Sequence, residues 1–261
     1  MELGLKGKVA LVTGGSRGVG RAIAQALLAE GASVMITARD PQRLAAAREQ
    51  LAHDGGEVRA AAADLEDDAA VRSMVQATIE QFGHFDILVN AAGSVNPADF
   101  ASLTEAVWPA LFEQKLNGYV RCLRHAIPHL KTRGWGRIIN LAGVGGREAG
   151  AITIPVGLNN AAVLNLTKSI ALIMAPYNVL VNAVVPHIID TDRQDETMSL
   201  LADLTGQPEA QIRQERLNKL PLKRMGRAEE VAAVVAFLAS ERASFVVGAA
   251  WHVDGGAYHG I

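Results

Sequence analysis

The sequence is poor in cysteine and in aromatic residues, and neither sign of charge dominates. Its 261 residues include one cysteine and three tyrosines, and the formal net charge is -2. The single Cys122 excludes an internal disulfide framework and suits a reducing compartment. Phosphate backbones and anionic membranes bind concentrated basic charge, so the balanced composition argues against nucleic-acid and membrane partners.

Long hydrophobic runs and leader-like segments are also missing. Residues 1–8 are too short and polar for a signal peptide, and the uncharged stretch from Ala149 to Thr167 is interrupted by Pro155, Asn159 and Asn160. Amides are expensive inside a bilayer, so a buried helix is the better interpretation of that stretch. We therefore expect a cytoplasmic protein with no membrane partner.

Short apolar runs alternate with segments of helical spacing. The expected strands are Val9–Val12, Ser33–Thr37, Val58–Ala62, Ile87–Asn90, Arg137–Leu141, Val179–Val185 and Ala250–Val253. The expected helices are Gly20–Glu30, Pro41–Asp54, Ala69–Phe82, Leu103–Arg133, Leu158–Met174 and Ala228–Ala239. This alternation predicts an α/β fold of the Rossmann type: a doubly wound, parallel, seven-stranded sheet with helices on both faces.

No linker or repeat divides the chain, so we expect one domain over residues 1–261. One segment departs from the alternation: Arg193–Arg224 is charged, helical and inserted before the last helix. Its Met198, Leu200, Leu201, Leu204 and Ile212 make it amphipathic, which is typical of a cover over a cleft for an apolar small molecule and equally of ordinary helix packing.

A glycine-rich loop, Thr13-Gly14-Gly15-Ser16-Arg17-Gly18-Val19-Gly20, follows the first strand and opens a helix. Glycines let the backbone approach a pyrophosphate, and the helix N-terminus offers free amide donors. The strand and helix on either side distinguish this loop from a simple turn. It predicts dinucleotide binding.

With this spacing the sequence resembles the short-chain dehydrogenase/reductase family over nearly its whole length. Further matches are Asp64, Asn90-Ala91-Ala92-Gly93, Asn117, Pro186, Thr191, Pro221-Leu222, Arg224, Gly226 and Val253-Asp254-Gly255-Gly256. The resemblance implies an oxidoreductase that assembles as a homodimer or homotetramer, through faces on Leu103–Arg133 and Leu158–Met174. The implied coenzyme contacts are Gly14, Ser16, Arg17, Gly18, Val19, Gly20, Arg39, Asp64, Leu65, Asn90, Ala91, Gly93, Pro186 and Thr191.

The end of the second strand predicts which coenzyme is bound. An acid there commonly binds the ribose 2′-hydroxyl of NAD, but this chain has Ala38 followed by Arg39. A guanidinium suits a 2′-phosphate, and Arg17 offers a second contact; the alternative is that both are ordinary surface arginines. We predict NADP(H).

The residues that usually perform the family's chemistry are replaced. None of the three tyrosines has a lysine four residues later, and the resemblance places Gly143, Val156 and Asn160 on the family's serine, tyrosine and lysine. Only Asn117 would remain of the proton relay. Valine donates no proton, so we expect the usual ketone–alcohol mechanism to fail.

Other groups are candidates to replace the missing donor or to bind substrate. His187 follows Pro186, where the nicotinamide is expected, and imidazole titrates near neutrality; it is equally a packed or solvated histidine. Glu148, Asn159 and Asn160 are candidates for substrate contact, although a solvated charge and capped backbone groups explain them as well. His125 and His129 share a helix face without an acid nearby in sequence, and we expect no metal site.

Two functions stay open from sequence. One is an atypical enzyme acting on a small apolar molecule, by reducing an imine or an activated C=C bond, or by a redox-neutral isomerisation, dehydration or cyclisation. The other is a catalytically inactive pseudoenzyme that binds NADP(H) as a sensor, regulator or oligomer partner.

Overall fold

The computed structural model describes residues 2–53 and 55–260. Seven parallel strands form one sheet in the order β3-β2-β1-β4-β5-β6-β7. The strands are β1 (Val9–Thr13), β2 (Ser33–Ala38), β3 (Val58–Ala62), β4 (Ile87–Asn90), β5 (Gly136–Leu141), β6 (Val179–Pro186) and β7 (Ala250–Val253). The predicted sheet is confirmed, and the change of direction between β1 and β4 creates the crevice where open α/β sheets bind ligands.

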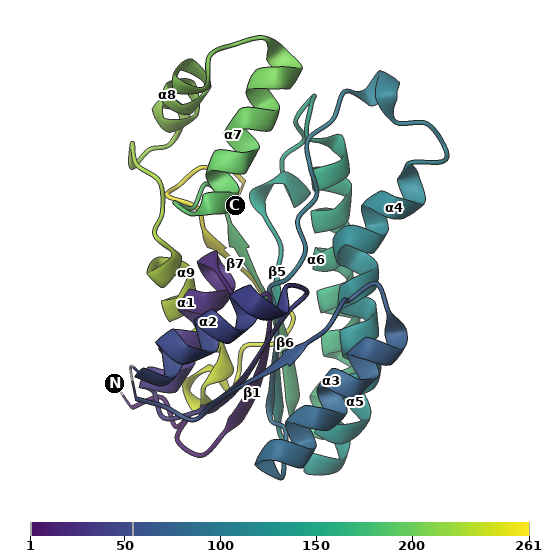
Figure 1. Cartoon of the computed structure of the whole chain (residues 1–261), viewed down its shortest axis with the longest axis vertical. Coiled ribbons are helices and arrows are strands. Elements are labelled where there is room, and N and C mark those ends of the chain that lie inside the picture. Colours follow the sequence, from purple (N-terminus) through teal and green to yellow (C-terminus); the bar gives the residue numbers. More distant parts are fainter. Residues whose placement is uncertain (1, 54, 261) are drawn as a thin grey trace.

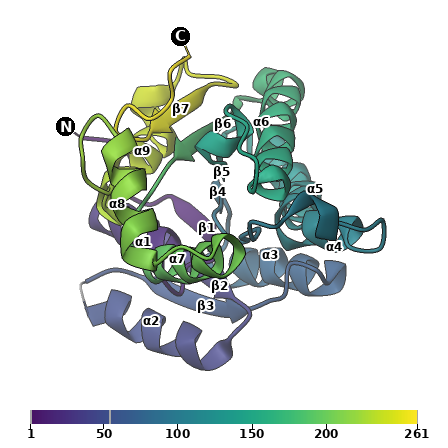
Figure 2. The ribbon, with the colours of Figure 1, turned by 90° about the horizontal axis from the view of Figure 1, so that it is seen from above.

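Helices cover both faces of the sheet (Figures 1 and 2). One face carries α1 (Gly18–Ala29), α2 (Pro41–His53) and α9 (Ala228–Ala239), whose apolar residues share one core with the strands. The other carries α3 (Asp68–Phe82), α5 (Gly118–Arg133) and α6 (Ile154–Met174) over a second core. The central strands are buried on both faces, which explains their near-continuous apolar sequence.

The expected helix Leu103–Arg133 is wrong as a single element. The chain forms α4 (Trp108–Phe112), a π-helical turn over Glu113–Asn117, and then α5. Pro109 lies in the first turn of α4, where its missing amide hydrogen costs no hydrogen bond, and this favours a helix start there over a helix continuing from Leu103. The π-helical turn holds one residue more than an α-helical turn, and such turns occur often at functional sites.

Helix α6 begins at Ile154, four residues before the expected start, because Pro155 is compatible with a first helical turn. Within the described residues, the segment Ile154–Tyr177 is the one helix long and apolar enough to span a membrane by length and composition. One face of it buries Asn159, Asn160 and Thr167 and packs on β6, whereas Leu158, Leu172 and Ile173 are exposed, so the helix is only partly buried and not the buried helix expected from sequence.

The inserted segment folds into α7 (Asp192–Thr205) and α8 (Glu209–Lys219), which we call the flap. Figure 1 shows the flap above the carboxyl ends of the strands, across from α4 and the start of α6. Met198, Leu201 and Ile212 pack together between its two helices, and Ile152 contacts this cluster from the loop before α6.

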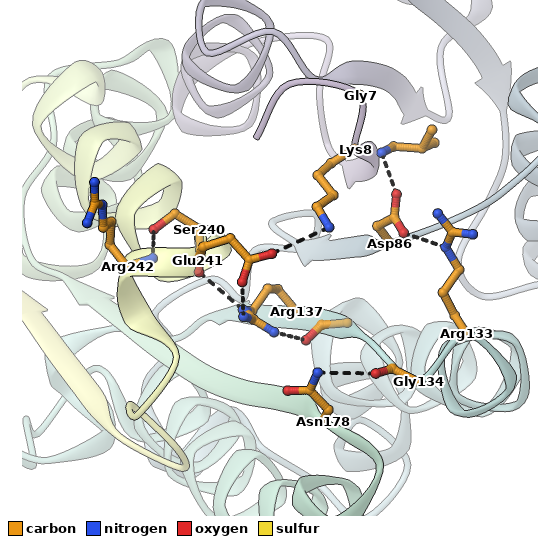
Figure 3. A network of polar contacts seen from close by, with 12 residues as sticks. Gly7, Lys8, Asp86, Arg133, Gly134, Arg137, Asn178, Ser240, Glu241 and Arg242 are labelled. Carbon is orange, nitrogen blue, oxygen red and sulfur yellow. Dashed lines mark hydrogen bonds and ion pairs between the residues drawn. The ribbon is translucent and has the colours of Figure 1, made fainter. Parts of the chain in front are cut away.

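Polar contacts fasten the opposite, amino-terminal edge of the sheet (Figure 3). The fully buried Arg137 donates to the carbonyls of Ser240 and Gly136 and lies 3.5 Å from Glu241. Asp86, also buried, accepts from the Val9 amide and pairs with Arg133 at 2.7 Å. These charge-assisted contacts close the sheet at the amino ends of its strands, whereas the carboxyl ends of the strands, below the flap, are open.

Candidate active site

A cleft of about 760 Å³ lies at the carboxyl ends of the strands. It runs from the glycine-rich loop and the ends of β2 and β3 to the π-helical turn, the end of β6 and the first turn of α7. One continuous cleft therefore joins the predicted dinucleotide loop to the predicted chemical end.

The glycine-rich loop has the form that a pyrophosphate requires. Gly14 has a φ of +70°, and a Cβ there would lie 2.9 Å from the Ala92 Cα; a Cβ on Gly20 would lie 2.2 Å from the Gly14 carbonyl oxygen. Thr13 Oγ1 accepts from the amides of Ala91 and Ala92, which fastens the loop to the end of β4. No side chain caps the described start of α1, so its first amides stay available for an anion.

The far end of the cleft carries the residues that would distinguish two coenzymes. Arg39 is exposed after the end of β2, and Asp64 and Leu65, after the end of β3, line the same cleft. Sequence reasoning missed Arg43, which also lines this end of the cleft from the first turn of α2, four residues after Arg39. Asp40 lies between them, but its carboxylate accepts from the amide of Arg43 at the start of α2.

Of the predicted coenzyme residues, all but one line the cleft: Gly14, Ser16, Arg17, Gly18, Val19, Gly20, Arg39, Asp64, Leu65, Ala91, Gly93, Pro186 and Thr191. The exception is Asn90. It is fully buried and donates to Asn140 Oδ1 at 2.9 Å, joining β4 to β5 below the cleft. Its part of the motif is structural.

Arg17 is engaged by the flap. Its Nη1 lies 2.6 Å from Glu196 Oε1 on α7, and this contact lowers the pKa of Glu196. Arg193 on α7 donates to Asn96 in the loop after β4, at 2.7 Å. These two contacts hold the flap across the mouth of the cleft. Among the described residues, Arg39 and Arg43 at the far end make no hydrogen bond or ion pair with the flap, and Arg43 lies 4.0 Å from Asp40.

The residue missed at the chemical end is Lys115. It lines the cleft from the π-helical turn and is 9% exposed. Its Nζ donates to Asn160 Oδ1 at 2.8 Å and to the Ala142 carbonyl at 3.4 Å, both neutral acceptors. Burial lowers the pKa of Lys115 from 10.5 to about 8.

Asn117, the predicted relay residue, is directed elsewhere. Its side-chain amide donates to Glu113 Oε1 at 2.6 Å, and Arg121 binds the other oxygen of that carboxylate. The extra residue of the π-helical turn changes which side chains face the cleft, so Lys115 lies there and Asn117 does not.

Tyr119 also lines the cleft, one turn after Lys115. Lys115 precedes Tyr119 by four residues, whereas in the order implied by the family resemblance the tyrosine comes first and the lysine follows four residues later. The Tyr119 side chain is fully buried, its hydroxyl donates to the Leu141 carbonyl at 3.1 Å, and burial strongly raises its pKa. This phenol is held as a structural donor.

Of the three positions assigned to the family's serine, tyrosine and lysine, Gly143 and Asn160 lie side by side, and Val156 lies near Gly145, two residues after Gly143. A Cβ on Gly143 would lie 2.9 Å from Asn160 Nδ2. A Cβ on Gly145 would lie 4.0 Å from Val156 Cγ1. Asn160 therefore spans the gap between Gly143 and Lys115, giving its oxygen to the lysine and turning its nitrogen toward the glycine.

The remaining predicted substrate contacts serve the framework. Asn159 is buried and donates to the carbonyls of Leu111 and Pro155, which fastens α6 to α4. Glu148 accepts from the backbone amide of His259, and this bond lowers its pKa. Neither residue lines the cleft.

His187 does line the cleft, as predicted. Burial lowers its pKa below 6.5, and the nearby Arg216 lowers it further, against smaller opposing effects of Asp254 and Glu148. The imidazole is therefore mainly neutral at pH 7 and can accept or donate one hydrogen bond without carrying charge.

Comparisons with known proteins identify reductases as relatives of this chain. The family model described as Enoyl-(Acyl carrier protein) reductase matches residues 14–258. A 3-oxoacyl-[acyl-carrier-protein] reductase, FabG, of Aquifex aeolicus is 34% identical over 99% of this chain and 100% of its own. The NADPH-dependent reductase BacG of Bacillus subtilis is 32% identical over 97% of this chain and 99% of its own.

Solved structures are equally similar. L-Sorbose reductase from Gluconobacter frateurii, in complex with NADPH and L-sorbose, superposes with a TM-score of 0.92 at 32% identity and full coverage of both chains. YwfH, an NADPH-dependent reductase involved in bacilysin biosynthesis, gives a TM-score of 0.90 at 32% identity, over 97% of this chain and 99% of its own. The chain therefore belongs to the short-chain dehydrogenase/reductase family.

Proposed function

We propose that this protein is an NADP(H)-dependent reductase of a small molecule. The observation that carries the proposal is the single cleft that joins a complete pyrophosphate loop and an arginine rim to Lys115 and His187. NADPH, when bound, supplies a hydride from its nicotinamide ring to an electron-poor carbon. The agreement of the relatives named NADPH-dependent reductases with the prediction from Arg39 supports this coenzyme.

The chain's own groups divide the work of holding the coenzyme. The free amides at the start of α1 bind the pyrophosphate, and Arg39 with Arg43 meets the 2′-phosphate. The flap, fastened by Arg17–Glu196, covers the site and limits water at the reacting end.

At the reacting end we propose that the chemistry departs from the family's serine–tyrosine–lysine arrangement. Gly143 and Val156 carry no group that donates a proton, and Asn160 is uncharged. This set favours hydride acceptors that are already electron-poor, namely an imine or a C=C bond conjugated to a carbonyl. The second candidate is a redox-neutral isomerisation, dehydration or cyclisation in the same cleft, which would form product without oxidising NADPH.

We further propose a cytoplasmic homodimer or homotetramer. The outer surface of α6 exposes Leu158, Leu172 and Ile173, and Tyr177 follows on the same segment. Apolar side chains gathered on the outside of one long helix are typical of a subunit interface. Sedimentation of the wild type against Leu172→Glu tests this assignment.

The functional test measures coenzyme binding and turnover separately. NADPH and NADH are titrated calorimetrically, and oxidation of reduced nicotinamide is followed with ketones, imines and enones. We expect tighter binding of NADPH than of NADH and turnover of at least one acceptor class. Gly14→Val, which places side-chain atoms against Ala92, is the binding-deficient control.

Each other outcome has a definite meaning. Product formation without net oxidation of NADPH identifies a redox-neutral reaction. Tight NADPH binding without any chemistry identifies a coenzyme-binding pseudoenzyme, and failure to bind NADPH overturns the proposal altogether.

A further inference from the structure

Lys115 is a buried cation without an acidic partner among the described residues. Its two acceptors, Asn160 Oδ1 and the Ala142 carbonyl oxygen, are uncharged. An ammonium group has three hydrogens, so one remains for a further acceptor, and Lys115 lines the cleft.

Lys115 is a better proton donor than the other titratable groups near it. Tyr119, whose ring centroid is 5.8 Å from Nζ, keeps its hydroxyl on the Leu141 carbonyl. Glu113, in the same turn, is held by Arg121 and Asn117. His187, across the cleft at the end of β6, is mainly neutral at pH 7 and is then a weak acid.

The charged groups of α7 that line the cleft belong to its mouth. Arg193 pairs with Glu196, which also binds Arg17, and Asp192 lines the same rim. Among the described residues, Arg193 and Glu196 make no hydrogen bond or ion pair with Lys115 Nζ.

We propose that the Lys115 ammonium is the proton donor of the reduction and that Asn160 is its positioning residue. The inference rests on the proposed function. The arrangement implied by the family resemblance has a lysine on α6 and an asparagine in the preceding helix. Here the two are exchanged: the lysine, Lys115, comes from the π-helical turn, and the asparagine, Asn160, comes from α6.

The proton step balances without a further reagent. For an enone, the hydride from NADPH forms a C–H bond at the β-carbon, and the C=C electron pair moves toward the α-carbon. The α-carbon, or the oxygen of the resulting enolate, takes a proton as the Nζ–H bond breaks, and the electrons of that bond stay on nitrogen. Lys115 then recovers a proton from solvent. A lysine with its pKa near the working pH suits this exchange.

The first test separates hydride transfer from proton transfer. The wild type, Lys115→Met and Lys115→Arg are compared with a cyclic enone and with an N-methylated cyclic iminium ion of the same ring size. Reduction of the enone needs a proton, whereas the iminium ion becomes a neutral tertiary amine on hydride addition alone. We expect both variants to lose about 10²-fold or more in kcat for the enone and to retain the iminium rate.

Two further variants sharpen the assignment. Lys6→Met, at an exposed lysine on the opposite edge of the sheet, is the matched control and should change neither rate. Tyr119→Phe tests the rival donor: a loss of enone reduction in Tyr119→Phe with full activity in Lys115→Met overturns the inference. Asn160→Ala should lower the enone rate and shift its pH profile, as a positioning residue would.

The second test needs no turnover. In protein labelled with ¹³C at the lysine ε-carbons, the resonance absent from Lys115→Met belongs to Lys115, and its pH titration gives the pKa directly. We expect a midpoint near 8. A midpoint at the ordinary value of about 10.4 overturns the inference even if the enzyme turns over.

The two proposals fail differently. Iminium reduction that is equal in all proteins, with enone reduction unaffected in Lys115→Met, rejects Lys115 and keeps the reductase. Turnover of neither acceptor by the wild type rejects the reductase and the donor role together.

Discussion

Replacing Lys115 by methionine should change how the stability of the fold depends on pH. Lys115 is buried, and its pKa is lowered from 10.5 to about 8 by burial alone. Between these two pH values the unfolded chain holds a proton that the folded chain has released. Unfolding then takes up a proton, so rising pH favours the folded state across this window.

The magnitude follows from the width of the window. One proton is worth about 1.4 kcal/mol per pH unit, so the wild type should gain about 3 kcal/mol over Lys115→Met between pH 8 and pH 10.5. Below pH 8 the penalty of the buried cation is fully present. In this range Lys115→Met removes the desolvation cost of the buried ammonium group. It also leaves Asn160 Oδ1 without a donor, which costs about 1–3 kcal/mol, so the wild type and the variant should be close in stability.

Urea unfolding of both proteins at several values between pH 7 and pH 10.5 measures this difference. Subtracting the variant from the wild type cancels the titration of every other group. Lys6→Met, where the lysine is exposed, should give a constant difference over the same range. A constant difference for Lys115→Met as well would refute the reasoning, because it would mean that the folded and unfolded chains hold the Lys115 proton equally.

Three further predictions concern the rest of the cleft. Arg39→Asp should weaken NADPH binding at least tenfold and reverse the preference toward NADH, as calorimetric titration would show; an unchanged preference would exclude Arg39 as the phosphate contact. Glu196→Gln removes the charge that pairs with Arg17, so limited proteolysis should cut the flap faster in the variant than in the wild type, and equal rates would contradict its role as a clasp. The His187 imidazole should titrate below pH 6.5 in proton NMR, and Arg216→Met should raise its midpoint, whereas an unmoved midpoint would exclude Arg216 as a cause.

The sheet was predictable from sequence because its strands are buried on both faces and therefore read as apolar runs. Val9–Thr13 and Ile87–Asn90 differ from the expected ranges by at most one residue. The glycine-rich loop was equally clear, since the φ of Gly14 and the contact at Gly20 leave no room for a side chain. In both cases one local property decides the structure.

The chemical end was less predictable because it depends on helix geometry. The family resemblance suggested Asn117 as the relay residue of the cleft, but the π-helical turn places Lys115 there instead. Asn90 belongs to a recognisable motif, yet its amide binds Asn140 on the neighbouring strand, a contact that sequence separation conceals. A buried lysine is also invisible to composition, because nothing in the sequence marks it as lacking an acidic partner.

These contacts change what a restoration of the family's usual residues requires. Asn160→Lys alone would put a second ammonium group where Asn160 Oδ1 now lies, 2.8 Å from Lys115 Nζ, and like charges so close and buried repel strongly. Gly143→Ser alone would press its Cβ to 2.9 Å from Asn160 Nδ2. The position that faces the cleft is 115, so the relay asparagine that the resemblance implies belongs there.

We therefore expect the triple variant with Gly143→Ser, Val156→Tyr and Asn160→Lys to be destabilised and inactive toward ketones. Adding Lys115→Asn should recover stability in urea unfolding and produce ketone reduction. Equal stability and activity of the triple and quadruple variants would show that positions 115 and 160 are not coupled.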